Sequence, residues 1–220
     1  MLNNIIKKGF DIAKQKIPIS QELDVSQNNA ANIHKKDSAY IEASGFVYLL
    51  LDSSGSMADG QKLSQAKKAA IDYAKDAITK GYRVGLIKFG SEAVHLCDPQ
   101  RTLSTLVSSL RTMESCGSTD MAGAIGLADR KLLGKGPRKF VCIATDGFPD
   151  NQQLAIDAAR TAKRNGIEII TVGTDDADKD FLRKLATRTD FVIKVKRDQF
   201  GEAIASTAKM LPLPPGRKGH

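Results

Sequence analysis

The stretch 46–56 (FVYLLLDSSGS) decides how this chain folds, because a short apolar run passes directly into a polar loop that contains a glycine. Six consecutive apolar residues are typical of a parallel strand that is covered on both faces. Comparable runs recur along the chain, at 84–89, 140–144, 167–172 and 191–195. We therefore expect five buried strands, of which 46–51 is the first.

Helical patterns lie between these strands. In 62–79 the small and apolar residues Leu63, Ala66, Ala70, Ala74 and Ala77 recur every three or four positions, and Gly81 is placed to end the helix. Further helices are expected at 103–113, 120–133, 151–165, 178–187 and 198–210. A short run at 92–97 follows the second strand closely and is expected to pair with it as an antiparallel edge. The alternation predicts an α/β fold, with a doubly wound, mostly parallel sheet flanked by helices and one short antiparallel edge strand.

Composition divides the chain of 220 residues into three parts. Residues 1–43 combine an amphipathic N-terminal segment with a polar linker that lacks periodicity. Residues 44–210 hold all the predicted strands and are long enough for one domain with a full core. Residues 211–220 (LPLPPGRKGH) form a proline-rich tail that is expected to leave the domain as an extended segment.

Charge and cysteine content narrow the class of protein. The net charge is +8, of which the first 40 residues contribute +2 and the last ten another +2. The basic residues are therefore spread along the chain, which argues against a nucleic-acid-binding protein. No stretch reaches the roughly 18 apolar residues of a membrane span. Cys97, Cys116 and Cys142 show neither metal-ligand spacing nor a disulfide framework. Reduced thiols and the lack of a secretory signal predict a cytoplasmic protein.

Three polar loops hold the candidate functional residues. Asp52, Ser54 and Ser56 follow the first strand, Asp146 follows the strand at 140–144, and Thr119 precedes the helix at 120–133. Each loop has an ordinary structural explanation, because Asp, Ser and Gly favour turns, and Thr119 or Ser118 could be a helix N-cap. In a doubly wound sheet, however, ligands bind beyond the carboxyl ends of the strands, so all three loops are expected at one rim.

The residue types on these loops indicate a metal ion. Two carboxylates and three hydroxyls provide only oxygen ligands, which suits Mg²⁺ or Mn²⁺ and argues against Zn²⁺. Asp52, Ser54 and Ser56 occupy alternate positions of one loop, so several oxygens can point at one centre. Since two carboxylates only neutralise a divalent ion, the metal should keep a coordination position that attracts an anionic oxygen from outside.

At these positions the chain resembles a von Willebrand factor A (vWA) domain over residues 44–210. The series Asp52-x-Ser54-x-Ser56, Thr119 and Asp146 is similar to the five-residue metal-ion-dependent adhesion site (MIDAS) of that family. The resemblance implies a Rossmann-like fold, hydroxyl ligands from Ser54, Ser56 and Thr119, and carboxylates that act directly or through water. It also implies that a Glu or Asp of a partner protein completes the metal's coordination. Without a signal peptide or paired cysteines, the chain is more similar to intracellular, bacterial-type members than to secreted ones.

The sequence thus predicts a protein-binding scaffold or adaptor module, not an enzyme. The main alternative is a metal-dependent phosphotransferase or phosphatase that uses Asp52 as its nucleophile. Haloacid-dehalogenase-type phosphatases carry a second Asp two residues later as general acid, where this chain has Ser54. A Ser nucleophile would lack a base, because His34, His95 and His220 lie in a linker, an expected edge strand and the terminus.

Overall fold

The computed structural model of the protein describes residues 45–115 and 117–214. The N-terminal segment expected over 1–43, Cys116 and most of the proline-rich tail lie outside these described residues. The strands are β1 (Gly45–Asp52), β2 (Tyr82–Phe89), β3 (Ala93–Gln100), β4 (Arg138–Thr145), β5 (Ile167–Gly173) and β6 (Val192–Lys194). The α-helices are α2 (Lys62–Lys80), α3 (Ser104–Arg111), α4 (Met121–Leu132), α5 (Gln152–Arg164), α6 (Lys179–Leu185) and α7 (Phe200–Ser206). Short 3₁₀ helices are η1 (Gly55–Gln61), η2 (Thr189–Phe191), η3 (Arg197–Gln199) and η4 (Thr207–Met210).

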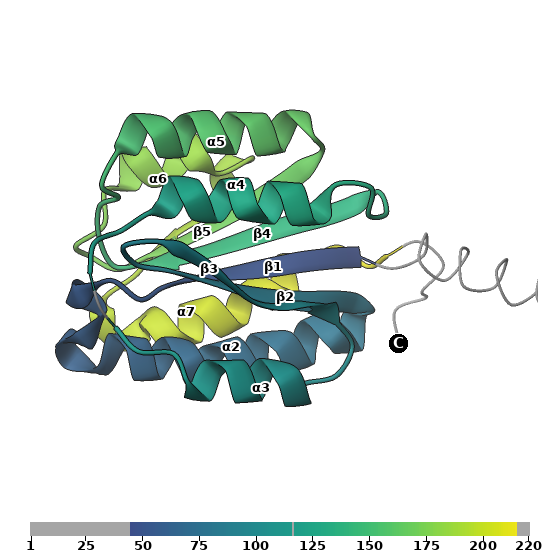
Figure 1. Cartoon of the computed structure of the whole chain (residues 1–220), viewed down its shortest axis with the longest axis horizontal. Coiled ribbons are helices and arrows are strands. Elements are labelled where there is room, and N and C mark those ends of the chain that lie inside the picture. The colour runs from purple at the N-terminus through teal and green to yellow at the C-terminus, as the bar shows by residue number, and fades with distance from the viewer. Residues whose placement is uncertain (1–44, 116, 215–220) are drawn as a thin grey trace, which may run out of the picture. The chain divides into compact units, whose positions relative to one another are not determined.

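The predicted fold class is confirmed. The six strands form one sheet in the order β3-β2-β1-β4-β5-β6, and every neighbouring pair is parallel except β2 and β3. Helices α2, α3 and α7 cover one face of the sheet, and α4, α5 and α6 cover the other (Figure 1). The antiparallel edge strand, expected at 92–97, extends to Gln100 with irregular register against β2.

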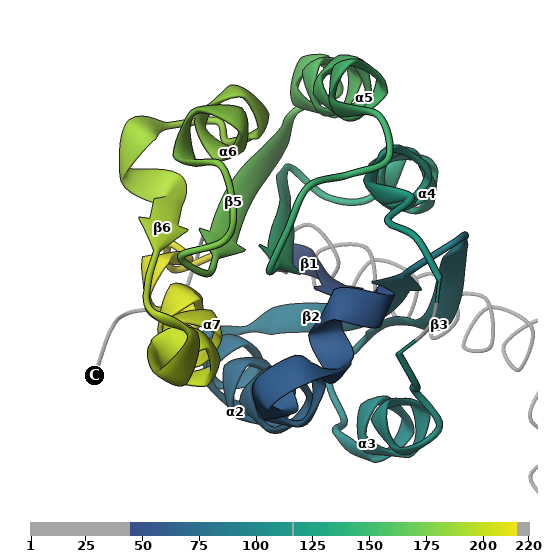
Figure 2. The same cartoon turned by 90° about the vertical axis from the view of Figure 1, so that its left-hand side faces the viewer.

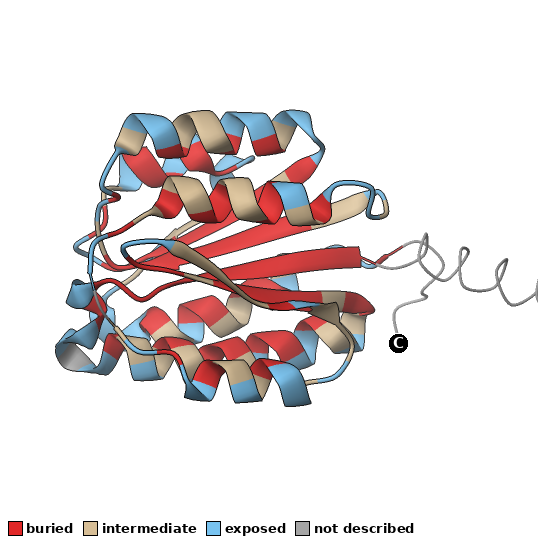
Figure 3. Cartoon of the chain, viewed as in Figure 1, coloured by how far each residue is buried: buried red, intermediate tan, exposed pale blue. Residues whose placement is uncertain are grey.

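Coverage of both faces explains why β1 is an unbroken apolar run. Val47, Leu49 and Leu51 belong to the core beneath α2 and α7, and Tyr48 and Leu50 belong to the core beneath α4 and α5. All eight residues of β1 are buried (Figure 3). A strand with two buried faces must be apolar at successive positions, so its polar residues begin only where the strand leaves the core.

The sheet order places the end of β1 where the winding of the sheet reverses. From β1 the chain moves outward through β2 to β3, and it then returns to the other side of β1 through β4, β5 and β6. The carboxyl ends of β1 and β4 are therefore adjacent, which is the position where doubly wound sheets bind ligands. Figure 2 looks onto this edge, with η1 in front of it.

The end of α2 follows the predicted signal. Gly81 ends α2 with φ of 101°, a left-handed conformation that an L side chain rarely adopts. The helix expected at 198–210 is α7 flanked by the 3₁₀ helices η3 and η4.

No helix among residues 45–115 and 117–214 has the length and apolarity that crossing a membrane requires.

The first residues of the expected tail lie against the domain. Leu211 is buried. The Lys80 ammonium donates to the Leu211 carbonyl (2.9 Å), and the Tyr82 hydroxyl donates to the Pro212 carbonyl (2.7 Å). Leu211 and Pro212, the first two residues of the expected tail, therefore pack against the domain.

Candidate metal centre

Asp52 is the last residue of β1 and its carboxylate is fully buried. One carboxylate oxygen accepts a hydrogen bond from the Ser54 backbone N–H (2.8 Å), and the other accepts one from the Thr145 hydroxyl (2.6 Å). Burial raises the pKa of Asp52 to about 6, although these hydrogen bonds oppose the shift. The carboxylate is thus fixed in orientation while its negative charge remains poorly compensated.

Ser54, Ser56 and Asp146 form a continuous chain of hydrogen bonds. The hydroxyls of Ser54 and Ser56 are 3.1 Å apart, and the Ser56 hydroxyl donates to Asp146 Oδ1 (2.8 Å). Ser54 and Asp146 are buried, whereas Gly55 and Ser56 are exposed. The side chains of the loop after β1 and of the loop after β4 therefore converge, and the cluster faces solvent only at Ser56.

Thr119 lies on a third loop, which is tied to the other two through the backbone. Its N–H donates to Asp150 Oδ1 (2.9 Å), and its carbonyl accepts from the Asp150 N–H (3.0 Å). Two residues earlier, the Gly117 carbonyl accepts from the Gly55 N–H (3.0 Å). The loop of Thr119 is thus linked to both the loop after β1 and the loop after β4.

The structure also decides whether Thr119 caps the helix that follows it. The N-cap of α4 is Asp120, whose side chain accepts from the Gly123 N–H (2.9 Å). Neither Thr119 nor Ser118 has this role. The hydroxyl of Thr119, on a residue that is 9% exposed, is therefore not used for capping.

Gly117 permits the path of this third loop. Its φ is +74°, and a Cβ built there would lie 1.8 Å from the Ser91 hydroxyl oxygen. The positive φ favours glycine, and a Cβ there would displace the Ser91 hydroxyl. The approach of Gly55 to the Gly117 carbonyl depends on this turn.

Sequence reasoning missed a cation in this cluster. The ammonium of Lys62, the first residue of α2, donates to Asp146 Oδ2, and Lys62 and Asp146 are 3% and 1% exposed. The residue before it, Gln61, has a left-handed backbone (φ 60°, ψ 20°) and is the only described non-glycine residue with positive φ. The apolar stripe of α2 begins at Leu63, so nothing in the spacing marked Lys62 as buried. Thr145 and Asp150, which hold Asp52 and Thr119, were missed as well.

The donor set fits a hard divalent cation. Within the part of the chain that the structure describes, no group of three or more His, Cys, Asp or Glu side chains is placed to hold a metal. The cluster instead offers two carboxylates and the hydroxyls of Ser54 and Ser56, with Thr119 on the adjoining loop. Asp52, Asp146 and Lys62 together carry a charge of −1. Oxygen ligands with a negative total charge suit Mg²⁺ or Mn²⁺.

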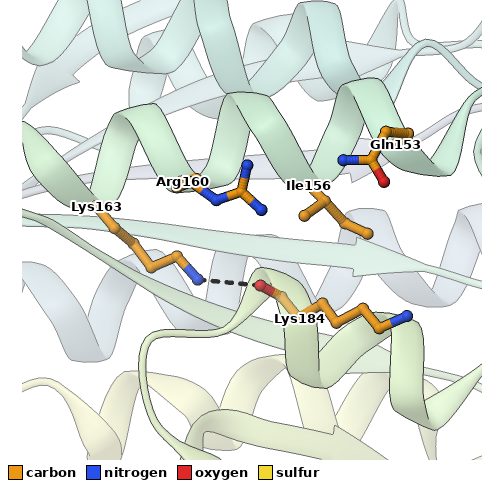
Figure 4. Close-up of a pocket in the computed structure, with 5 residues that line it drawn as sticks. All are labelled: Gln153, Ile156, Arg160, Lys163 and Lys184. Carbon is orange, nitrogen blue, oxygen red and sulfur yellow. Dashed lines mark hydrogen bonds between the residues drawn. The ribbon is translucent and has the colours of Figure 1, made fainter.

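A separate pocket of about 380 Å³ lies between α5 and α6 (Figure 4). Gln153, Ile156, Arg160, Lys163 and Lys184 line it. The Lys163 ammonium donates to the carbonyl of Lys184 (3.0 Å), and Arg160 pairs with Asp157. None of the five predicted metal residues lines this pocket, so it is separate from the candidate metal centre.

Comparisons with known proteins agree with this fold. The model of the von Willebrand factor type A domain matches residues 47–205. No curated protein matches the chain. Among solved structures, the vWF domain of the type V pili tip protein Mfa5 from Porphyromonas gingivalis has a TM-score of 0.67 at 14% identity, covering 80% of this chain and 98% of that one.

Two further structures share the fold. The conserved hypothetical protein BatB from Bacteroides thetaiotaomicron has a TM-score of 0.63 at 19% identity, covering 76% of this chain and 98% of that one. Proximal thread matrix protein 1 from the mussel byssus, solved with a zinc-occupied MIDAS motif, has a TM-score of 0.61 at 16% identity, covering 77% of this chain and 46% of that one. The family model spans most of the sequence and the sheet order is that of a doubly wound fold, so this chain belongs to the von Willebrand factor type A domain family.

Proposed function

We propose that this chain is a divalent-metal-dependent protein-binding module that uses a MIDAS to capture an acidic side chain of a partner. The observation that carries the proposal is the hydrogen-bonded chain from Ser54 through Ser56 to Asp146, beside the buried Asp52. Family membership supports it, since vWA domains often mediate metal-dependent protein interactions. The zinc-occupied MIDAS of the mussel protein is a precedent for a divalent ion in this fold.

The residues have distinct roles in this proposal. Ser54, Ser56 and Thr119 would supply hydroxyl oxygens to Mg²⁺ or Mn²⁺, and Asp52 and Asp146 would bind it directly or through water. The metal would supply electrostatic attraction for an anionic oxygen. Because Ser56 is exposed while the carboxylates are buried, a partner would approach from the side of Ser56.

We further propose that the module is not an enzyme. Both carboxylate oxygens of Asp52 accept hydrogen bonds within the protein, and position 54 offers a hydroxyl in place of a general acid. A phosphatase assay with a generic phosphate ester should therefore show no turnover that depends on Asp52. A rate that disappears in Asp52→Asn would favour the phosphatase alternative.

The cytoplasmic location stays a prediction. The buried free thiols of Cys97 and Cys142 are compatible with it.

The test of the binding function is affinity capture with immobilised protein, followed by mass spectrometry. Proteins should be retained by the wild type in Mn²⁺ or Mg²⁺, and lost when a chelator replaces the metal or when Asp52→Asn replaces the wild type. The control variant Lys68→Met alters an exposed residue of α2 and should retain the same proteins. Retention that is equal with metal and with chelator would contradict the proposal.

A further inference from the structure

Lys62 is buried, although lysine rarely is. Burial of an ammonium is costly unless a negative group compensates it, and here that group is the Asp146 carboxylate. Every other ion pair among the described residues leaves at least one partner more than half exposed. The pair of Lys62 and Asp146 is therefore unlike the surface pairs, and it lies within the candidate metal centre.

The backbone directs Lys62 into this cluster. Gln61 adopts a left-handed conformation immediately before α2, which costs free energy for a residue with a side chain. Gln61 is the last residue of η1, the 3₁₀ helix that begins directly after Ser54 and contains Ser56, so this turn connects these residues to the first residue of α2. The left-handed turn at Gln61 thus immediately precedes the residue whose ammonium enters the cluster.

Both oxygens of Asp146 are already bound within the protein. Oδ1 accepts from the Ser56 hydroxyl and Oδ2 accepts from the Lys62 ammonium. A divalent ion that approaches Asp146 is consequently repelled by the Lys62 ammonium, which is bound to the same carboxylate. Like charges repel more strongly in a partly desolvated site than in water.

We infer that Lys62 is a built-in counter-cation that weakens metal binding on its own and couples the metal to an anionic ligand. The inference rests on the proposed function. With Asp52 and Asp146 ionised, a divalent ion leaves the loaded centre with a charge of +1 because of Lys62, where the two carboxylates alone would leave it neutral. A carboxylate from outside then brings the centre to neutrality. Metal and acidic ligand should therefore bind cooperatively, each raising the affinity for the other by the same factor.

The test is to titrate the wild type, Lys62→Met and Lys62→Gln with Mn²⁺ and to measure the binding affinity of each protein by calorimetry. Met removes the charge at similar length, and Gln removes it while keeping an N–H donor for Asp146. Lys68→Met is the matched control, because it removes one charge from an exposed position of the same helix. Removing the repulsion should tighten Mn²⁺ binding about tenfold in both Lys62 variants, and Lys68→Met should bind like the wild type.

Two further measurements complete the test. In chelator, Lys62→Met should melt at a lower temperature than Lys68→Met, because Asp146 loses its counter-ion. When acetate replaces chloride at equal ionic strength, the affinity for Mn²⁺ should rise more in the wild type than in Lys62→Gln. Acetate serves here as a simple carboxylate probe for the coupling.

The outcomes separate this inference from the function on which it rests. If the wild type binds Mn²⁺ and both Lys62 variants bind it equally or more weakly, the counter-cation role is wrong while the metal site stands. If none of the four proteins binds Mn²⁺, the proposed function fails and the inference fails with it. If Lys62→Met does not fold, Lys62→Gln decides the result by the same comparison.

Discussion

The hydroxyl of Thr145, at the end of β4, donates a 2.6 Å hydrogen bond to the carboxylate of Asp52, at the end of β1. Both residues are fully buried. The bond joins the two strands at the point where the winding of the sheet reverses, and it holds one oxygen of Asp52 in place. An unpaired carboxylate oxygen at this position would be costly, so the bond contributes to both stability and site geometry.

We expect Thr145→Val to destabilise the protein by about 1–3 kcal/mol, because it leaves a buried acceptor of Asp52 without a donor. Urea denaturation in chelator measures the free energy of unfolding without any metal contribution. Thr145→Ser is the control, since it keeps the hydroxyl and should be much closer to the wild type. Equal destabilisation by Val and Ser would assign the effect to packing and not to the hydrogen bond.

Added Mn²⁺ or Mg²⁺ should raise the melting temperature of the wild type. An ion that binds only the folded state stabilises it by roughly 2.7 kcal/mol at a 100-fold excess over the dissociation constant. Asp52→Asn keeps the shape of the side chain and should fold, but it should lose most of the response. Scanning calorimetry of both proteins with metal and with chelator makes the comparison. Identical melting curves of the wild type in all conditions would refute the metal site.

Asp146→Ala should lower the free energy of unfolding far more than Asp52→Asn does, because it leaves the Lys62 ammonium buried without a counter-ion. Removing one partner of a buried pair costs about 3–5 kcal/mol. The double variant Asp146→Ala/Lys62→Met should recover much of that stability, because no unpaired charge remains. Urea denaturation of the two single variants and the double variant measures the coupling energy. Additive effects of the two substitutions would mean that the ion pair contributes nothing.

Most strand and helix positions could be predicted because each rests on a local pattern, but the buried strand expected at 191–195 is the three-residue β6, which is partly exposed. The run 46–51 is continuously apolar since β1 is covered on both faces, and the 3–4 spacing in α2 reflects its single buried face. Gly81 signals the end of α2 for a conformational reason that acts within a few residues. The mostly parallel sheet could be predicted from the alternation of strands and helices, because parallel strands need crossover connections, whereas the order of the strands comes from the structure.

The supporting residues of the candidate site could not be predicted in this way. Lys62 reads as a solvated residue at a helix start, and its burial depends on Asp146, which lies 84 residues further along the chain. Thr145 continues a strand pattern, so only the pairing of β4 with β1 shows that its hydroxyl reaches Asp52. Contacts between distant loops are set by tertiary packing and leave no periodic signal. The five predicted metal residues could be proposed from the sequence because they follow strand ends or precede a helix, positions that the sequence does mark.

A separate polar cluster connects β1, β3 and α4. The Tyr48 hydroxyl lies 3.1 Å from His95 Nε2 and donates to Asp98, which also pairs with Lys131. The pKa of His95 is lowered mainly by burial and to a lesser extent by the Lys131 ammonium, while Asp98 opposes this shift. The folded state therefore binds a proton at His95 less readily than the unfolded state does.

It follows that the contribution of His95 to stability is present above the unfolded pKa of about 6.5 and is lost as the pH falls below it. The free energy of unfolding of the wild type should decrease more between pH 7.5 and pH 5 than that of His95→Gln, which cannot take up a proton. Urea denaturation at both pH values, in chelator, measures the difference. The same decrease in both proteins would show that His95 does not contribute to the pH dependence.

Recognition of the partner should depend on the hydroxyl of Thr119 and on one acidic residue of the partner. The loop of Thr119 is held by Asp150 and by the contact between Gly55 and Gly117, and the residue does not cap α4, so its hydroxyl is available to the metal. Thr119→Ala should weaken binding of the isolated partner by about tenfold or more, because the ion loses a ligand that fixes it where the carboxylate arrives. Thr119→Ser keeps the hydroxyl and should bind almost normally.

Replacement of the partner's acidic residue by Ala should abolish binding in Mn²⁺, whereas substitutions around that residue should have smaller effects. Calorimetry of the partner against the wild type, Thr119→Ala and Thr119→Ser, each with Mn²⁺ and with chelator, gives the affinities. If all of these affinities were equal, the partner would have to bind at a surface other than the metal centre.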